Sequence, residues 1–396
     1  MQINNAHLAY CTNIYAGESW EAHFHALQRD FPQIKTEISP KSAMGIGLRL
    51  SNQASIEILE GENLQYFKRW LQQNNAYVFT MNGFPYGGFH DVVVKDQVHA
   101  PDWTTDDRLA YTQRIFKILA ALLPKGIEGG ISTSPLSYKY WFNTQYEMLD
   151  ATAKATMNIL QIARQLNEIY EKSGIILHLD IEPEPDGLLE TGREFIDWYE
   201  KVLLPLGRKS FADQAEVDTI IKRHINLCYD VCHFAVGYES HREVIAELTE
   251  KKIKTGKIQI SAALKALFNG DAENRRAILS EFAQFDEPTY LHQVIARHKD
   301  GQVLRYPDLS DALALNDTAV EWRAHFHVPI FLAQFGLLSS TQSDIIEVLA
   351  IWKEQLFTKH LEVETYTWGV LPPELKYPMA RSISRELGWV IEQIKA

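Results

Sequence analysis

The chain has 396 residues, of which 46% are hydrophobic, and its formal net charge is −12. A protein that binds nucleic acid through its general charge usually shows a basic face, and no cluster of lysine and arginine stands out in this sequence. The composition therefore argues against nucleic-acid binding and fits a cytoplasmic protein that acts on a small molecule.

Eight segments of the chain have the apolar character of buried β-strands. In chain order they are 7–14, 44–51, 76–84, 129–136, 175–182, 225–233, 257–264 and 361–368. Stretches with apolar residues at helical spacing fit between several of them, which indicates that strands and helices alternate along the chain.

Three of the intervening helices are the clearest. Residues 105–123 carry an apolar stripe, and two aspartates fall in the first turn, where the helix dipole favours acidic side chains. Residues 151–172 carry a longer stripe and are followed by Gly174, which is typical of a helix end. A further helix is expected over about 342–358, ahead of the last strand.

Alternating strands and helices imply a parallel sheet with right-handed crossovers. Eight such units predict an α/β fold of the (β/α)8 TIM-barrel type, which often runs longer than an ordinary domain. An open doubly wound sheet is the alternative, but no glycine-rich phosphate loop follows the first strand. We therefore expect residues 1–396 to form a single TIM-barrel domain with its functional residues at the C-terminal ends of the strands.

One region, 265–335, does not follow this alternation. Within it, residues 290–309 read as a β-hairpin that turns at a Lys-Asp-Gly sequence, and residues 321–331 form another strand-like segment. We expect the region to be an insertion in the seventh βα-loop that covers the mouth of the barrel. Alternatively, the AHFHVPIF sequence (324–331) is itself a barrel strand, which would leave nine candidates for eight places.

The alternation of side chains along a strand separates residues that face the helices from residues that point into the barrel. In the fifth predicted strand, His178, Asp180 and Glu182 share the inward face. By the same reasoning, the inward residues nearest the C-terminal ends of four strands are Glu182, Asp230, Gln259 and Glu364.

Three carboxylates that converge without a cation repel one another, and a bound divalent ion resolves that conflict. Oxygen ligands with one amide suit Mg²⁺ or Mn²⁺, and added histidine ligands would shift the preference toward Zn²⁺. Each residue alone has an ordinary alternative, since a strand-end glutamate often forms a salt bridge and Gln259 could be a hydrogen-bonded core residue. The four together predict a site for one divalent ion of Mn, Mg or Zn.

Other residues near the expected mouth are candidates for substrate binding. The His-x-His pair of the AHFHVPIF sequence lies on one face of an extended segment, where it can bind a metal or a substrate unless the segment is an ordinary exposed strand. The third βα-loop, 82–103, is long and rich in aromatic residues, which either stack on a substrate or pack the loop. The candidate substrate-binding residues are His90, His325, His327, Glu184 and Trp368.

The cysteine count and the N-terminus bear on the cellular compartment. Cys11, Cys228 and Cys232 are too few for a disulfide framework. The N-terminus has no basic region followed by an apolar run, so no signal peptide is expected. The longest apolar runs fall far short of the roughly 20 residues that a membrane-spanning helix needs. We therefore expect a cytoplasmic protein that does not insert into a membrane.

The set of strand-end residues resembles that of the xylose-isomerase-like TIM-barrel superfamily, which includes sugar phosphate isomerases and epimerases and endonuclease IV. In the isomerase branch, one metal is held by a Glu on strand five, an Asp with a His three residues on, a His or Gln on strand seven and a Glu on strand eight. The residues that fit this order here are Glu182, Asp230 with His233, Gln259 and Glu364.

Five longer stretches resemble the EboE type of metabolite traffic protein, over nearly the whole chain. They are LAYCTNIYAGESW, FTMNGFPYGGFH, ISTSPLSYK, RAHFHVPIF and LEVETYTWGVLP. This resemblance implies a cytoplasmic barrel encoded in the ebo cluster, whose other proteins are the implied partners. It also implies a link to the processing or transport of a secondary-metabolite precursor, without an established reaction.

Together these features predict a metal-dependent enzyme of the isomerase or epimerase type that acts on a small polyhydroxy or hydroxycarbonyl compound. The metal would bridge adjacent oxygens and acidify the C–H bond between them. Glu182 or Glu364 would move the proton, while His233 and His327 would polarise oxygens. Two alternatives remain open: a non-catalytic metabolite-binding carrier on the same fold, and a metal-dependent phosphoesterase, which the net charge disfavours.

Overall fold

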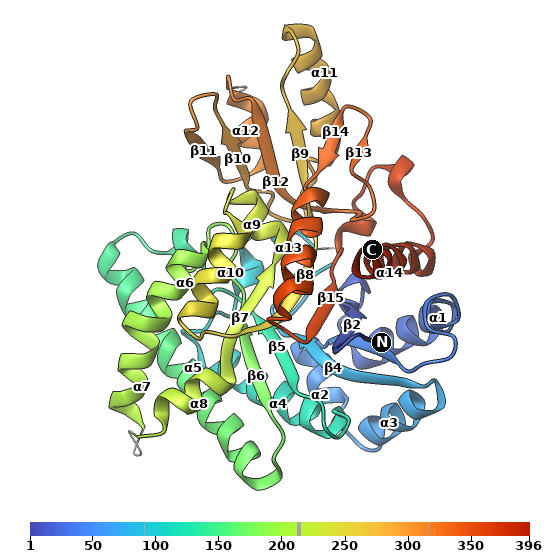
Figure 1. Cartoon of the computed structure of the whole chain (residues 1–396), viewed down its shortest axis with the longest axis vertical. Coiled ribbons are helices and arrows are strands. Elements are labelled where there is room, and N and C mark those ends of the chain that lie inside the picture. Colours follow the sequence, from blue (N-terminus) through green and yellow to red (C-terminus); the bar gives the residue numbers. More distant parts are fainter. Residues whose placement is uncertain (91, 212–214, 316) are drawn as a thin grey trace.

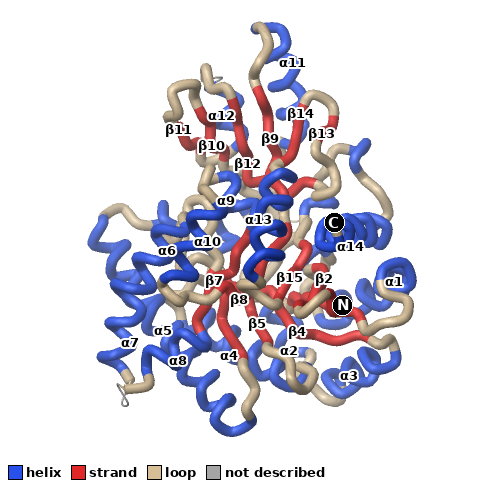
Figure 2. Tube along the Cα trace, viewed as in Figure 1, coloured by secondary structure: helices blue, strands red, loops and turns tan. Residues whose placement is uncertain are grey.

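The computed structural model describes residues 1–90, 92–211, 215–315 and 317–396. Its strands form a nine-stranded sheet, which curls into a barrel, and a separate six-stranded sheet that lies at one end of the barrel (Figure 1). Helices surround the strands of the barrel (Figure 2).

Eight parallel strands make up the barrel. They are β2 (Ala6–Tyr10), β3 (Met44–Arg49), β4 (Ala76–Asn82), β5 (Gly129–Thr133), β6 (Leu177–Ile181), β7 (Ile225–Asp230), β8 (Thr255–Ile260) and β15 (His360–Val363). They pair in the order β2-β15-β8-β7-β6-β5-β4-β3, and a bridge between Cys11 and Gly47 brings β2 beside β3. The short strand β1 (Gln2–Ile3) pairs antiparallel with β2. The predicted TIM barrel is confirmed, and each of the eight predicted segments overlaps one strand of the barrel.

The helices that follow the barrel strands lie mostly on the outside of the sheet. In chain order they are α1 (Trp20–Ile38), α2 (Asn52–Glu57), α3 (Asn63–Gln73), α4 (Asp106–Leu122), α5 (Gln145–Ser173), α6 (Gly192–Trp198), α7 (Leu204–Ser210), α8 (Val217–His224), α9 (Val231–Val236), α10 (His241–Glu250), α13 (Gln342–Gln355) and α14 (Met379–Lys395). Two more, α11 (Ala272–Phe282) and α12 (Leu309–Leu315), accompany the second sheet.

The longest helix, α5, shows how local chemistry sets the ends of an element. Thr144 and Glu147 form a reciprocal capping box at its start. Gly174 ends it with a φ of +70°, which glycine adopts without strain. The helix therefore begins before residue 151, the predicted start, because the capping box precedes the part of the helix that carries the apolar stripe.

The second sheet is entirely antiparallel. Its strands are β9 (Ala262–Leu267), β10 (Val294–Arg297), β11 (Val303–Tyr306), β12 (Glu321–Val328), β13 (Gln334–Phe335) and β14 (Leu338–Ser340), in the order β11-β10-β12-β9-β14-β13. The predicted hairpin is the β10–β11 pair. Because β12 pairs with β10 and β9, the AHFHVPIF sequence belongs to this sheet, and the alternative that it is a barrel strand is wrong.

The chain passes from the barrel to the second sheet within one residue. Strand β8 ends at Ile260 and β9 begins at Ala262, so the predicted strand 257–264 is in fact parts of two strands in different sheets. Ser261 lies at this junction, where its hydroxyl donates to Asp230 Oδ1 at 2.6 Å and accepts from Cys232 N at 3.0 Å. The second sheet therefore starts directly beside the strand ends of the barrel.

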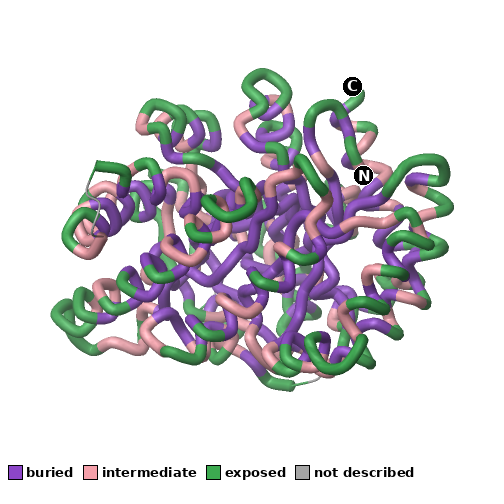
Figure 3. Tube along the Cα trace, turned by 90° about the horizontal axis from the view of Figure 1, so that it is seen from below, coloured by how far each residue is buried: buried purple, intermediate pink, exposed green. Residues whose placement is uncertain are grey.

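Buried residues concentrate in the strands at the centre of the molecule, and exposed residues lie on the outer surfaces of the helices (Figure 3). On β6, Leu177, Leu179 and Ile181 are fully buried and belong to the apolar core. In the described part of the chain, no helix is both long enough and apolar enough to cross a membrane.

Candidate metal centre

Four side chains from neighbouring strands meet at the C-terminal end of the barrel. Gln259 on β8 donates from Nε2 to Glu182 Oε1 at 2.9 Å, to Asp230 Oδ2 at 3.1 Å and, more closely, to Glu364. Carboxylate oxygens of the three acidic residues lie within 4.8 Å of one another. The structure thus brings together the four residues that the sequence analysis singled out as metal ligands, and we call them the floor cluster.

The floor cluster has one donor group too few for its acceptors. A side-chain amide carries two N–H groups, so Gln259 cannot donate fully to three carboxylates at once. Glu182 Oε2 is buried and has no hydrogen-bond partner among the described residues. An oxygen-rich set with one amide is the ligand chemistry that hard divalent cations prefer, so the residues present fit such an ion.

Burial and mutual repulsion govern the charges of the floor cluster. Burial, reinforced by neighbouring carboxylates, raises the pKa of Glu182 and of Glu364 well above its ordinary value. Burial also opposes ionisation of Asp230, but His233, His327 and a hydroxyl hydrogen bond lower the pKa of this carboxyl below its ordinary value. Asp230 is therefore the group most readily ionised, and a cation would favour ionisation of the other two.

Two asparagines that the sequence analysis missed hold Glu364 in place. Asn13 Nδ2 donates to Glu364 Oε1 at 2.6 Å, and Asn82 Nδ2 donates to the same oxygen at 2.8 Å. Asn82 is the last residue of β4, and Asn13 follows β2 by a few residues. Their position at strand ends is the same signal that identified the carboxylates, so the rule could have been extended to amides.

Two histidines near Asp230 use one ring nitrogen in a hydrogen bond to a backbone carbonyl. His233 Nδ1 donates to Pro183 O at 2.9 Å, and His327 Nδ1 donates to Glu364 O at 3.1 Å. A carbonyl only accepts, so in the neutral rings the proton is on Nδ1 and Nε2 carries the lone pair. His327 Nε2 is buried without a partner among the described residues. Because ligand atoms of Asp230, His233 and His327 lie within 4.8 Å of one another, these imidazoles could contribute to a metal site.

A further acidic residue, Glu184, lies beside the floor cluster. Its Oε1 lies 2.8 Å from His99 Nε2, and its carboxylate forms a close group with His233 and His325. His99 lies in the 82–103 loop and was not among the predicted site residues. The structure therefore places Glu184 and His325, which were predicted to bind substrate, near enough to the metal-binding groups to act as ligands themselves.

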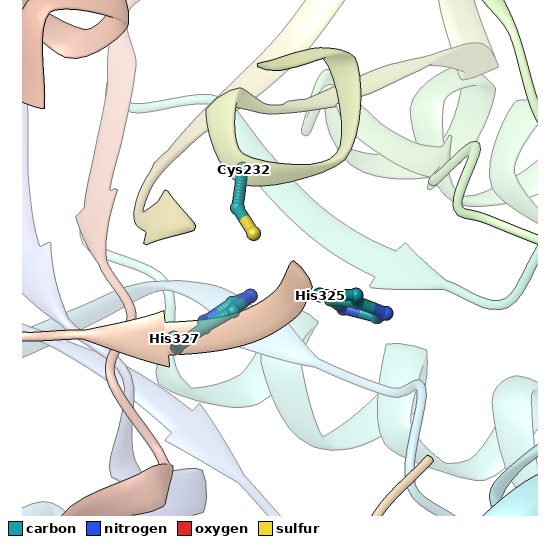
Figure 4. A group of neighbouring side chains, drawn as sticks. All are labelled: Cys232, His325 and His327. Carbon is teal, nitrogen blue, oxygen red and sulfur yellow. The ribbon is translucent and has the colours of Figure 1, made fainter. Parts of the chain in front are cut away.

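Cys232 on α9 forms another close group with His325 and His327 on β12. The His327 ring is directed toward the sulfur, whereas the His325 ring extends away from it (Figure 4). Burial, together with Asp230 and Glu364 nearby, raises the pKa of the Cys232 thiol well above its ordinary value. The thiol therefore stays protonated, and the group is a weaker candidate for a metal site than the floor cluster.

Glu182 and Glu364 of the floor cluster line a pocket of about 60 Å³ between the barrel and the second sheet. Its apolar wall includes Phe89, Tyr290 and Tyr366, whose ring centroids are 5.1–5.2 Å apart. Lys95 also lines the pocket and is paired with Asp308 at 2.5 Å. The pocket thus combines carboxylates and imidazoles at one end with aromatic side chains at the other.

Two of the predicted substrate-binding residues lie outside the set that lines this pocket. His90 Nε2 donates to Asn13 O at 2.5 Å, and its Nδ1 accepts from the Tyr290 hydroxyl at 2.9 Å. His90 therefore positions residues of the pocket. Strand β15 ends at Val363 and not at residue 368 as expected. Trp368 therefore lies beyond the strand, in the 3-10 helix Thr367–Gly369, where its side chain is buried.

Charged side chains also fill the barrel beneath the floor cluster. Lys257 Nζ donates to Glu362 and, at 2.9 Å, to Ser132 Oγ. His178 Nδ1 and Asp180 Oδ1 lie 2.6 Å apart. Lys257 was not singled out from the sequence, although it has the same alternation along β8 as Gln259 and so points to the same face.

Comparison with known proteins supports the fold. No protein-family model matches the chain, and neither does any curated protein. A xylose isomerase-like TIM barrel protein from Mycobacterium smegmatis in complex with magnesium has a TM-score of 0.51 at 9% identity, over 98% of this chain and 96% of that one. The IOLI protein with a binding zinc atom has a TM-score of 0.47 at 12% identity, over 98% of each chain. A D-tagatose 3-epimerase-like protein has a TM-score of 0.47 at 11% identity, over 98% of this chain and 97% of that one.

At 9% identity, the likeness to the Mycobacterium smegmatis protein shows the fold alone. The chain has a xylose-isomerase-like TIM-barrel architecture, as expected from the strand-end residues. What the chain binds and which reaction it carries out have to be argued from its own residues.

Proposed function

We propose that this protein is a metal-dependent enzyme of the isomerase or epimerase type that acts on a small polyhydroxy or hydroxycarbonyl compound. The single observation that carries the proposal is the convergence of Glu182, Asp230 and Glu364 on one amide, beside a pocket that Glu182 and Glu364 line. Three buried carboxylates cost free energy unless a cation compensates them. Such a cost is typical of a functional site rather than of a site that only stabilises the fold.

A divalent ion bound by Glu182, Asp230, Gln259 and Glu364 would supply Lewis acidity toward two adjacent oxygens of the substrate. The residues of the chain would do the rest. Burial and neighbouring carboxylates raise the pKa of Glu182 and of Glu364 well above its ordinary value, so these are the acidic side chains of the site on which a proton is most readily held. These two residues are the proposed proton carriers.

The histidines would orient the hydroxyl groups of the substrate. His327 Nε2 carries a lone pair and can accept a hydrogen bond from a hydroxyl, and His233 Nε2 can do the same. Burial lowers the pKa of His327 to about 4, so this ring is neutral at physiological pH. The aromatic wall of the pocket would exclude water from the reacting carbon.

The biological setting is part of the same proposal. The resemblance to the EboE type supports a role in the processing or transport of a secondary-metabolite precursor, with other proteins of the ebo cluster as partners. The low number of cysteines supports a cytoplasmic location, and Cys11, Cys228 and Cys232 are all buried and free.

Hydrogen exchange at carbon tests the proposal directly. The purified protein, loaded with Mn²⁺, is incubated in D₂O with a panel of aldoses, ketoses and α-hydroxyketones, and deuterium incorporation beside the carbonyl is followed by NMR. We expect exchange with at least one compound, and a loss of about 10²–10⁴-fold in Glu182→Gln and Glu364→Gln. Glu354→Gln is the control, because Glu354 is exposed and pairs with Arg242 at 3.0 Å, far along α13.

Two other results would change the conclusion. Absence of any bound divalent ion, with no stabilisation on adding Mn²⁺ or Zn²⁺, would overturn the metal-dependent function. Tight binding of a compound without exchange, unaffected by Glu364→Gln, would instead identify the protein as a metabolite carrier on the same fold.

A further inference from the structure

The Pro-Glu-Pro segment at 183–185, directly after Glu182, fixes a histidine of the barrel. The carbonyl of Pro183 accepts from His233 Nδ1 at 2.9 Å. This hydrogen bond sets the ring orientation and leaves Nε2, which lies 3.9 Å from Asp230 Oδ1, as the nitrogen that can bind a metal. His233 is in the first turn of α9, so the segment links the end of one barrel strand to the end of the next.

The second proline of the segment fixes a histidine of the second sheet through an amide. Gln293 Nε2 donates to Pro185 O at 3.1 Å, and this contact settles the orientation of the amide group. Gln293 Oε1 therefore accepts from His325 Nδ1, at 2.9 Å, and Nε2 of this ring carries the lone pair. Burial, followed by the neighbouring histidines, lowers the pKa of His325 well below its ordinary value, so the ring is neutral.

Glu184 lies between the two prolines and completes the group. Ligand atoms of Glu184, His233 and His325 all lie within 4.8 Å of one another, and each residue is buried. The rings of His233 and His325 are nearly perpendicular, with centroids 4.6 Å apart. His99 Nε2, 2.8 Å from Glu184 Oε1, holds the carboxylate in place as partners of metal-ligating carboxylates do.

Cys232 also lies beside His325, with its sulfur within 4.8 Å of a ring nitrogen. Burial raises the pKa of this thiol well above its ordinary value, so the thiol stays protonated and leaves the ring available to Glu184 and His233.

This group is chemically different from the floor cluster. The floor cluster offers three carboxylates and one amide, and it needs no imidazole to complete an oxygen-rich site. The second group offers two imidazole nitrogens and one carboxylate, a set that suits Zn²⁺ better than Mg²⁺ or Mn²⁺. His233 Nε2 lies 3.9 Å from Asp230 Oδ1, and its single lone pair binds one ion. On this assignment His233 belongs to the second group, and the floor cluster is completed by its own oxygen ligands.

We propose that Glu184, His233 and His325 hold a second divalent ion of the zinc type, at the wall of the pocket. This wall site depends on the second sheet, which delivers His325 across the end of the barrel. Its role in catalysis rests on the proposed function, but its ability to bind an ion does not. On this proposal His233 is a ligand, and His327 remains to contact the substrate.

Metal stoichiometry tests the wall site without any activity assay. The full chain is stripped with a chelator, loaded with Zn²⁺, passed through a desalting column and analysed for zinc and protein. We expect two zinc ions per chain in the unmodified protein and one in His325→Ala or Glu184→Gln. Glu364→Gln should also bind one, held at the wall, and X-ray absorption of this sample should show imidazole ligands to zinc.

His241→Gln is the matched control, because this buried histidine contacts Tyr229 at 2.8 Å and lies outside the set that lines the pocket. It should retain two zinc ions. One zinc ion in the unmodified protein, or two in both His325→Ala and Glu184→Gln, would overturn the wall site. The two proposals can fail separately. If the unmodified protein exchanges no substrate hydrogen but Glu364→Gln keeps its imidazole-ligated zinc, the proposed function fails and the wall site stands.

Gln293 offers a second test that keeps all three ligands. In Gln293→Leu the hydrogen bond to His325 Nδ1 is lost, so the ring is no longer oriented. Loss of such a partner typically weakens metal binding by about 10–100-fold. We expect a decrease of this size in the affinity of the wall site for Zn²⁺ by calorimetry, with Mn²⁺ binding at the floor cluster unchanged. An unchanged zinc affinity would contradict the proposed orientation of His325.

Discussion

Lys257 and Glu362 form an ion pair that is completely buried inside the barrel, two residues before Gln259 on β8 and before Glu364, which directly follows β15. Burial alone would lower the pKa of Lys257, but Glu362 raises it above its ordinary value. The lysine therefore stays charged. Its positive charge also lowers the pKa of Glu182 and Glu364, although not enough to offset burial.

Replacing this lysine should destabilise the protein. Lys257→Met leaves the Glu362 carboxylate buried without its partner, which typically costs about 3–5 kcal/mol. Urea denaturation followed by circular dichroism measures the loss. The double variant Lys257→Met, Glu362→Gln removes both charges and should recover a large part of the stability. A single variant within about 1 kcal/mol of the unmodified protein would show that the pair is not an important stabilising contact.

Glu386 on α14 should make stability depend on pH. Burial raises the pKa of Glu386 to about 8, although a hydrogen bond from Thr365 Oγ1 at 2.7 Å opposes the shift. The folded state thus holds a proton that the unfolded chain releases near pH 4.5. This contribution to stability is fully present below pH 4.5 and is lost as the pH rises toward 8.

Glu386→Gln removes this titration while keeping the shape of the neutral side chain. Relative to the unmodified protein, the variant should become progressively more stable between pH 5 and pH 8, by up to about 4 kcal/mol. Urea denaturation at both pH values checks this difference. Glu392→Gln, on the same helix and exposed, should show none of it. A stability difference that does not change with pH would mean that Glu386 is not protonated in the folded state.

Removing bound metal should lower the stability of the folded state. An ion that binds only the folded chain stabilises it by about 2.7 kcal/mol at a concentration 100 times its dissociation constant. We expect a chelator to lower the melting temperature and added Mn²⁺ to restore it. In Asp230→Asn the response to Mn²⁺ should disappear, because this residue is the most readily ionised member of the floor cluster. A full response in that variant would place the ion elsewhere.

The barrel and the floor cluster could be predicted from the sequence because both depend on local patterns. Apolar residues alternate along each strand, and this alternation alone places Glu182, Asp230 and Gln259 inside the barrel. Parallel strands then bring their C-terminal ends to one rim, whatever the loops between them do. The convergence of the four residues therefore needs no knowledge of distant contacts.

The second sheet could be predicted only in part. The β10–β11 hairpin has a local turn, but β9 pairs with β12 across more than 50 residues, and no local pattern encodes that register. The apolar run through Ser261 likewise hides the break between the two sheets. The position of His325 depends on this long-range pairing and on Gln293, so its relation to Glu184 was not accessible from the sequence.

The two asparagines that hold Glu364 give a last prediction about the floor cluster. Asn13 and Asn82 both donate to Glu364 Oε1, at 2.6 and 2.8 Å, and so hold this carboxylate in one orientation toward the barrel axis. Partners of this kind typically contribute 10–100-fold to metal affinity. We expect Asn82→Ala to weaken Mn²⁺ binding by about this factor in calorimetry, and the double variant with Asn13→Ala to weaken it further.

Asn158→Ala is the appropriate control for these variants. Asn158 is also a buried asparagine, and its Nδ2 donates to Trp103 O at 2.9 Å on the helical side of the barrel. This variant should lose stability, since a buried carbonyl loses its donor, yet keep its affinity for Mn²⁺. If Asn82→Ala and Asn158→Ala reduce Mn²⁺ affinity equally, the effect reflects general destabilisation, and Asn82 has no particular role in orienting Glu364.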